Sequence, residues 1–158
     1  MEVLAEVAGR TYGSVAVSAP ADFTSPFNAP FACLIWEHGA ASTEDERAAF
    51  ADRLLAAGCS YAVCGGANCE AWHDAVDEAV VARMVADGAD EPAHVMTTWH
   101  DGEGPDDVAS FFVLNTDFGE HKFQQYLVVH VGTSDEKGRV DEAVRGHARS
   151  QRGLHYEP

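Results

Sequence analysis

Each of the three tryptophans in this chain has a histidine and an acidic residue within two positions of it. Imidazole and carboxylate groups can bind metals, transfer protons or orient a ligand, and an indole ring adds an apolar wall with one N–H donor. These residue types side by side therefore indicate a binding or catalytic edge. The three clusters are Trp36-Glu37-His38, Trp72-His73-Asp74 and Trp99-His100-Asp101.

One chemistry that these residues support is a site for zinc or another divalent metal. His73 and Asp77 are four residues apart in an expected helix, so their side chains share one face. His38 and His100 lie at expected loop positions and would supply further ligands. A metal held in this way activates a bound water, which makes a small hydrolase one candidate function.

A hydrolase of this kind also needs a general base, and Glu70 and Asp101 are the candidates for that role. The metal set has no compact signature, because the chain contains neither a His-Glu-x-x-His motif nor paired Cys-x-x-Cys motifs. The alternative is that His73 and Asp74 are solvated on the surface of a helix, while His100 caps the end of a strand.

The four cysteines suggest a second, weaker chemistry. Cys69 stands near the expected N-terminus of a helix, where the helix dipole favours a thiolate, and His73 or His100 could act as its base. The segment from Cys64 to Cys69 lacks the arginine of a Cys-x5-Arg phosphate loop. Cys33 and Cys64 fall within apolar runs, where a thiol usually behaves as a small apolar side chain.

Gly65-Gly66 stands between an expected strand and an expected helix. Free amides at such a turn can hold an anion. The pair matches neither a Gly-x-Gly-x-x-Gly motif nor a phosphate-binding loop with Gly-Lys-Ser/Thr, and acidic residues follow it closely. A tight strand-to-helix turn is therefore the favoured interpretation.

Strand-like and helix-like segments alternate from residue 31 onward, and this order predicts how the clusters are positioned. Apolar runs at 30–36, 61–64, 94–99 and 126–131 are typical of buried strands. Helices are expected from the Ser42-Thr43 cap to about 57, from the Asn68 cap to about 87, from Pro105 onward, and over roughly 139–149. The alternation predicts an α/β fold, a small doubly wound and mainly parallel sheet of four or five strands between helices.

The whole chain, 1–158, is expected to form a single three-layer domain, with an irregular or hairpin segment at 1–30 and a basic segment at 137–158. In such sheets ligands bind outside the carboxyl ends of the strands. We therefore expect a ligand-binding edge made of Trp36, Glu37, His38, Cys69, Trp72, His73, Asp74, Trp99, His100 and Asp101. The remaining histidines, His94, His121, His130, His147 and His155, receive no role.

The chain is strongly acidic, with a formal net charge of −16 at pH 7. Residues 1–136 hold 23 acidic and five basic residues, whereas 137–158 hold three acidic and five basic ones. Such a body repels nucleic acid and anionic membranes, and it suits either a basic protein partner or a solubilising, salt-adapted surface. The basic segment, with Arg139, Arg145, Arg149 and Arg152, is expected to dock on the acidic body.

No apolar run approaches the ~20 residues that span a bilayer, and the first residues lack the pattern of a secretory signal, so we expect a cytoplasmic protein. The favoured function is a binding or accessory module that uses its Trp/His/Asp edge to engage a small molecule or a protein. The alternative is the metal-assisted hydrolase at the same edge. The sequence specifies neither the ligand nor the reaction.

Overall fold

The computed structural model describes residues 1–28, 30–39, 41–88, 94–117 and 122–151. In these residues six strands form one mixed, mostly parallel sheet with four α-helices and a short 3-10 helix, so the expected count of four or five strands is too low. None of the described helices is long and apolar enough to cross a membrane. The elements are β1 (Glu2–Val7), β2 (Arg10–Val17), η1 (Pro20–Asp22), β3 (Phe31–Glu37), α1 (Glu44–Ala56), β4 (Cys59–Gly66), α2 (Cys69–Asp87), β5 (Met96–Trp99), α3 (Pro105–Leu114), β6 (Gln125–Val131) and α4 (Glu136–Ser150).

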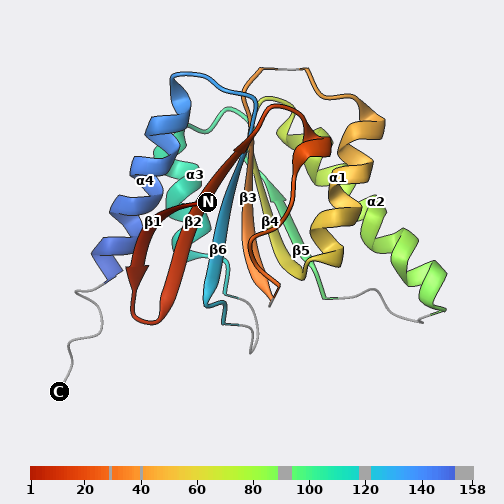
Figure 1. Cartoon of the computed structure of the whole chain (residues 1–158), viewed down its shortest axis with the longest axis horizontal. Helices are drawn as coiled ribbons and strands as arrows, with labels where there is room; N and C mark the ends of the chain where they lie inside the picture. The colour runs from red at the N-terminus through yellow and green to blue at the C-terminus, as the bar shows by residue number, and fades with distance from the viewer. Residues whose placement is uncertain (29, 40, 89–93, 118–121, 152–158) are drawn as a thin grey trace.

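The two strands that raise the count lie in the first 17 residues. The strand order is β1-β2-β6-β3-β4-β5, and β1 pairs with β2 in the antiparallel direction while all other pairs are parallel (Figure 1). The hairpin, one of the two forms expected for the N-terminal segment, is therefore present. Within it β1 lies at an edge of the sheet, whereas β2 is interior because it pairs with β6 along most of its length. The sequence contains no local signal for that pairing, which joins segments more than 100 residues apart.

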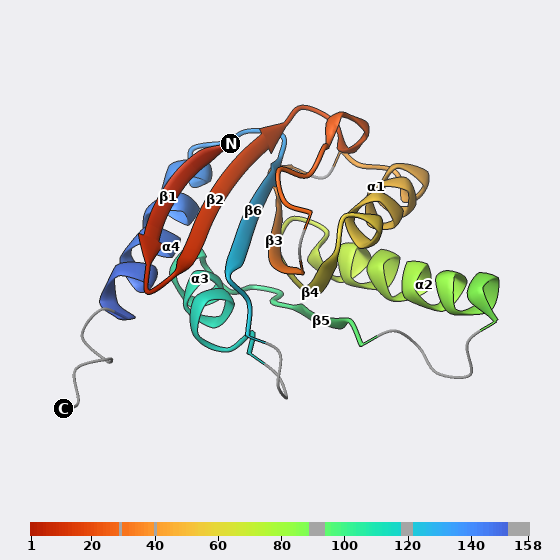
Figure 2. The same ribbon diagram turned by 60° about the horizontal axis from the view of Figure 1, so that its bottom comes forward.

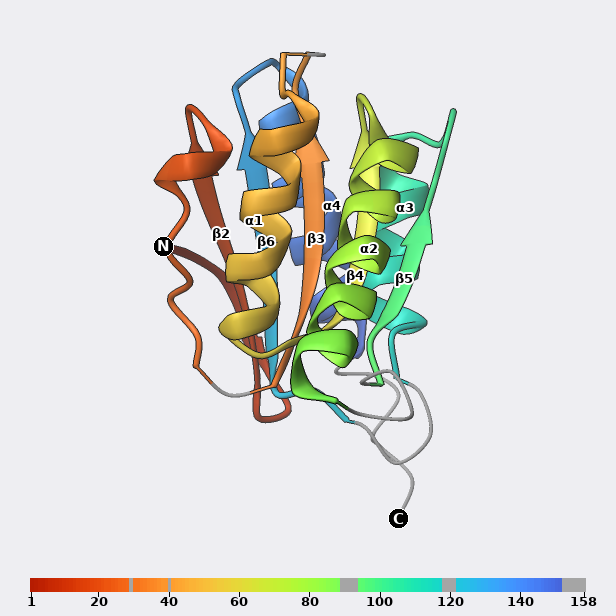
Figure 3. The same cartoon turned by 90° about the vertical axis from the view of Figure 1, so that its right-hand side faces the viewer.

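Helices cover both faces of the sheet: α1 and α2 lie on one face, and α3 and α4 lie on the other (Figure 3). Each face has its own apolar cluster, one containing Trp36 and the other Trp72. All seven residues of β3 are buried, as expected for a strand between two layers of helices.

The start of α1 follows the sequence prediction, whereas the start of α2 does not. Thr43 and Glu46 form a reciprocal capping box, so the predicted Ser/Thr cap is confirmed. Asn68 precedes α2 with a φ of 56° and makes no capping bond with its side chain. Its amide instead donates to Glu37, and this long-range contact displaces the local capping role.

The path of the chain through the sheet creates one place where neighbouring strands lead to opposite faces. The chain passes from β3 through β4 to β5 and then returns to place β6 on the other side of β3. The segment after β3 leads to α1, while the segment after β6 leads to α4 on the opposite face. Such a reversal opens a crevice at the carboxyl ends of the two strands, the usual ligand position in open α/β sheets.

The basic C-terminal segment forms α4, which packs against α3 and against the β1–β2 side of the sheet. Arg145 donates to the carbonyl oxygen of Leu4 and pairs with Glu2 and Glu142. Docking of this segment on the body is therefore confirmed for Arg145. Arg152, with the two unassigned histidines His121 and His155, lies outside the described residues.

Candidate functional site

The three tryptophan clusters occupy different environments, although their sequences are so similar. Trp36 and Trp72 are buried in the two cores, with 2% and 0% of their surface exposed, whereas 47% of Trp99 is exposed. The predicted edge is therefore divided into several groups of contacts. Two of the tryptophans are core residues, and only the third reaches solvent.

Glu37 fastens the first cluster to the second. Its carboxylate is buried and accepts hydrogen bonds from the Ser42 amide (2.9 Å), the Asn68 side chain (3.0 Å) and the Trp72 indole (3.1 Å). The N–H donor of the Trp72 indole is thus used within the protein. These three donors come from two loops and a helix, so Glu37 holds the ends of β3 and β4 together. Its carboxylate oxygens are already engaged in these hydrogen bonds and are not available to bind a ligand.

The glycine pair Gly65-Gly66 ends β4, and the turn into α2 follows at Ala67 and Asn68, so the predicted tight turn lies just after the pair. Gly66 has a φ of +72°, and a Cβ there would lie 2.7 Å from the carbonyl oxygen of Glu37. A side chain at Gly65 would lie 2.8 Å from the ring of Trp36. Close packing on β3 therefore accounts for both glycines.

His73 and Trp99 form an exposed group at the edge of the sheet. Their ring centroids are 4.5 Å apart, and His73 also pairs with Asp74 at 3.1 Å and with Asp77 at 3.4 Å. Asp77 in turn accepts a hydrogen bond from Thr97 of β5 at 2.6 Å. The predicted pairing of His73 with carboxylates on its own helix is present, and it lies beside the third tryptophan.

His100 lies on the opposite face of the sheet from His73, because its ring packs on Phe111 of α3, whereas His73 belongs to α2 on the other face. Its ring donates to Glu103 at 2.6 Å, accepts from Thr98 at 3.1 Å and packs on Phe111 of α3. His38 is separated from both, since β4 lies between β3 and β5.

The four proposed metal ligands His38, His73, Asp77 and His100 therefore make separate contacts in the structure. Among the described residues, no group of three or more His, Cys, Asp or Glu side chains is placed to hold a metal ion. The metal-assisted hydrolase stays a prediction from the sequence, and no contact among the described residues supports it.

The proposed general bases meet in one shallow pocket of about 470 Å³ beside the start of α2. The pocket is lined by Glu70 and Asp101 together with Asn68, Cys69, Ala71 and Asp74. Cys69 itself is only 3% exposed, and burial raises the pKa of its thiol. Burial therefore opposes the thiolate that the helix dipole was expected to favour at Cys69.

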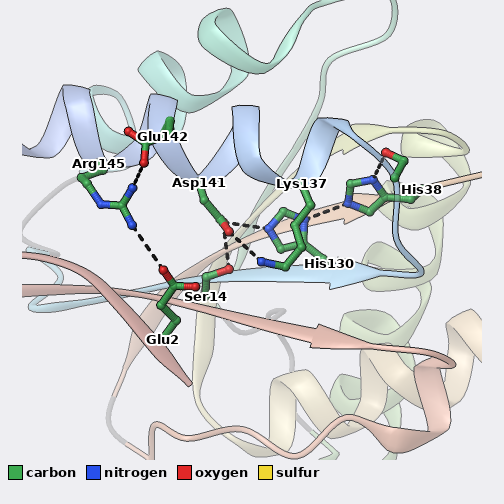
Figure 4. A network of polar contacts seen from close by, with 9 residues as sticks. Glu2, Ser14, His38, His130, Lys137, Asp141, Glu142 and Arg145 are labelled. Atoms are coloured by element: carbon green, nitrogen blue, oxygen red, sulfur yellow. Dashed lines mark hydrogen bonds and ion pairs between the residues drawn. The ribbon is translucent and has the colours of Figure 1, made fainter.

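The most extensive polar network lies at the crevice between β3 and β6, and it centres on a histidine that the sequence analysis left without a role. His130, near the end of β6, is fully buried. Its Nε2 lies 2.8 Å from Asp141 on α4, and its Nδ1 lies 2.8 Å from Nε2 of His38, as Figure 4 shows. The network thus joins two strand ends and the helix that covers them.

Asp141 is the anionic end of this network. Burial alone would raise the pKa of Asp141, but hydrogen bonds from His130, Lys137 and Ser14 outweigh it and lower the pKa to about 2. The carboxylate accepts from Ser14 at 2.8 Å and from Lys137 at 2.9 Å (Figure 4). Asp141 is therefore ionised at neutral pH, with its charge compensated on several sides.

His38 is the part of the network that reaches solvent. Burial lowers the pKa of His38, although the charges of Glu136 and Asp141 oppose the shift. Nδ1 of His38 lies 2.6 Å from the hydroxyl of Ser134, in the segment that leads into α4. The ring is therefore neutral at neutral pH and connects a buried carboxylate to a surface hydroxyl.

A small pocket of about 70 Å³ lies against His38 at the carboxyl ends of β2, β3 and β6. Its lining also includes Ala41, Ser42, Val131 and Gly132. Gly132 has a φ of +79°, and a Cβ there would lie 3.0 Å from the carbonyl oxygen of His38, so glycine keeps the two loops close.

One signal for this site was present in the sequence. His130 interrupts the apolar run Tyr-Leu-Val-Val-His-Val, and a polar group in a strand buried on both faces requires a partner. The identity of that partner was not visible, because Asp141, Ser14 and His38 come from three distant segments. Sequence analysis identified His38 but assigned it to a metal site with other histidines.

The family comparison covers most of the chain. The model of the family described as Domain of unknown function (DUF7684) matches residues 12–147. The chain belongs to this family. Comparisons with curated proteins and with solved structures found no match. The matched range includes most of β2, all of β6, most of α4 and both histidine groups described above.

Proposed function

We propose that this member of the DUF7684 family is a binding module that engages a basic protein segment through the edge of the sheet formed by β5. The observation that carries the proposal is the half-exposed ring of Trp99 on an edge strand. Tryptophan is among the residues that most often dominate the free energy of a protein interface. Leaving such a ring in water on a strand with a free edge favours a role in association.

The apolar surface extends beyond Trp99. His73, Asp77, Val81 and Val85 recur every four residues on α2, and the first two of them lie beside Trp99 and Thr97 of β5. Four of the large apolar residues with substantial exposure gather along this helix and strand: Val81 (52%), Val85 (72%), Met96 (43%) and Trp99 (47%). We call these four residues the β5 edge surface. Figure 2 shows β5 and α2 together at the end of the sheet opposite β1.

The charge around the β5 edge surface determines which partner suits it. Residues 69–117 contain twelve acidic residues and a single basic one, Arg83, which pairs with Asp52 of α1. Asp74 and Asp77, beside Trp99, have 61% and 51% of their side chains exposed. A second copy of a chain with a net charge of −16 would be repelled, whereas a basic segment would be attracted over long range.

The position of β5 also suggests the shape of the bound segment. Among the residues that the structure describes, β5 pairs with β4 alone, so its other side presents backbone groups that an added strand can use. Extended peptides commonly bind by adding a strand to such an edge, while side chains of alternate residues fill the neighbouring surface. The partner we propose is an extended segment in which basic and apolar residues alternate.

A dye-labelled peptide of alternating lysine and valine is a direct probe, and its binding can be measured by fluorescence anisotropy. We expect saturable binding that weakens as salt is added, because exposed charges are screened. Trp99→Ala should weaken the affinity at least about tenfold, as expected for a central aromatic contact. The matched control is Val3→Ala, which removes an apolar side chain that is 49% exposed on the opposite edge strand.

Three results would contradict the proposal. They are equal affinity for a glutamate–valine peptide, equal loss of affinity in Trp99→Ala and Val3→Ala, and no saturable binding by the folded protein. Sedimentation of the protein alone adds a further test. A stable dimer that Trp99→Ala dissociates would identify a second copy, and not a basic segment, as the partner.

A further inference from the structure

We propose that Ser134 is an acyl-accepting nucleophile, served by a relay of His38, His130 and Asp141. This inference concerns the crevice between β3 and β6 and does not depend on the partner proposed for the β5 edge surface. Its basis is the unbroken series of short contacts from the Ser134 hydroxyl through two imidazole rings to a buried carboxylate, at 2.6, 2.8 and 2.8 Å.

The direction of the hydrogen bonds follows from the carboxylate end. Ionised Asp141 only accepts, so Nε2 of His130 carries the proton and donates it. In the proposed relay each ring carries one proton, so Nδ1 of His130 accepts from Nε2 of His38, and Nδ1 of His38 accepts from the hydroxyl of Ser134. This tautomer assignment follows from the network and leaves each ring with one donor and one acceptor in use.

The assignment gives Ser134 the arrangement that activates a serine. A base lies within hydrogen-bond distance of the hydroxyl, and further groups hold that base in the required tautomer. Here His130 orients His38, and Asp141 orients His130. Ser14 and Lys137 fix Asp141 in turn, so the relay is held by β2, β3, β6 and α4.

The surroundings of Ser134 favour negative charge on oxygen. Its hydroxyl oxygen also accepts a hydrogen bond from the Glu136 amide at 3.1 Å, in the first turn of the 15-residue helix α4. Helix N-termini stabilise developing anions. The pocket of about 70 Å³ lies against His38, the residue that contacts Ser134, and its size suits a short acyl group. Small acyl esters are therefore the proposed substrate class.

The reaction has two balanced steps. The Ser134 oxygen attacks the carbonyl carbon of the ester while its proton passes to Nδ1 of His38, and that proton then leaves with the departing alcohol. Water next attacks the acyl-serine and gives its proton to the same nitrogen. The proton returns to the serine oxygen, and a carboxylic acid is released. Throughout both steps Asp141 stays ionised and accepts from His130.

A fluorophosphonate probe tests the nucleophile directly, since an activated serine displaces fluoride from phosphorus and the protein gains a defined mass. We expect one label per chain, on Ser134, and a burst of p-nitrophenol with p-nitrophenyl acetate. Ser134→Ala should abolish both signals. His38→Gln should slow labelling at least about 100-fold, the usual scale of general-base catalysis. The matched control is Ser60→Ala. Ser60 lies near the start of β4, at the end of the sheet opposite the site, so this variant should be labelled like the wild type.

His130 and Asp141 are positioning residues in this account, so their variants need a spectroscopic measurement. Imidazole N–H protons in short hydrogen bonds give downfield proton resonances, and Asp141→Asn should remove these while labelling slows. Should His130 or Asp141 variants fail to fold, the surface variants Ser134→Ala and His38→Gln still decide the question. The proposal is overturned if the folded wild type is not labelled, or if labelling persists in Ser134→Ala. Labelling that persists in Trp99→Ala would show that this site is independent of the β5 edge surface.

Discussion

The crevice between β3 and β6 and the edge formed by β5 both contain a histidine paired with an aspartate, yet the two pairs differ in burial. His130 and Asp141 have 0% and 7% of their side chains exposed, while His73 and Asp77 have 14% and 51%. A buried ionic group must be compensated by hydrogen bonds, and losing one partner is expensive. An exposed pair contributes little to folding and leaves its groups free to meet a partner.

The largest expected effect is the loss of stability in Asp141→Ala. This change removes the acceptor of His130, Ser14 and Lys137 at once and should lower the free energy of unfolding by about 3 kcal/mol. Urea denaturation followed by circular dichroism measures it.

The exposed pair supplies the matched control for this experiment. Asp77→Ala removes a carboxylate that contacts His73 and Thr97 and should change the free energy of unfolding by less than about 1 kcal/mol. Equal losses in Asp141→Ala and Asp77→Ala would show that burial does not distinguish the two regions.

A smaller effect is the contribution of Asp141 to stability at low pH. Its folded pKa of about 2 lies below the ordinary value of 3.8, so the contribution is fully present above pH 4 and is lost as the pH falls toward 2. The shift corresponds to about 2 kcal/mol. We expect the difference in unfolding free energy between the wild type and Asp141→Asn to shrink over this interval. A difference that stays constant between pH 4 and pH 2 would contradict the low pKa.

Much of the architecture could be predicted because it depends on local patterns. Apolar runs marked β3, β4, β5 and β6, and the Ser42-Thr43 cap with its following acids marked the start of α1. The pairing of β2 with β6 could not be predicted, since it joins segments more than 100 residues apart and no local pattern identifies the partner. The prediction that Asn68 caps α2 was wrong for a similar reason. Its side chain donates a hydrogen bond to Glu37, 31 residues earlier, and the local sequence does not reveal this contact.

The sequence predicted where the candidate site lies, at the carboxyl ends of the strands, better than it predicted which residues form it. The carboxyl ends of the strands do carry the histidines, and His38 belongs to the relay. The similarity of the clusters concealed a difference in environment: Trp72 packs in the core while Trp99 faces solvent. Whether a side chain faces solvent or the core depends on the strand order and on the placement of the helices. Neither can be derived from a triplet of neighbouring residues.

One titration can test whether the peptide binds at the β5 edge surface and leaves the β3–β6 crevice unchanged. The lysine–valine peptide is added to ¹⁵N-labelled protein, and the backbone amide and indole N–H resonances are followed. The indole N–H of Trp99 and the amides of β5 and α2 should shift, while the indole N–H of Trp72, bound to Glu37, and the amides of His38 and His130 stay in place. Shifts centred on the β3–β6 crevice or on β1, with the Trp99 resonance unchanged, would contradict the account.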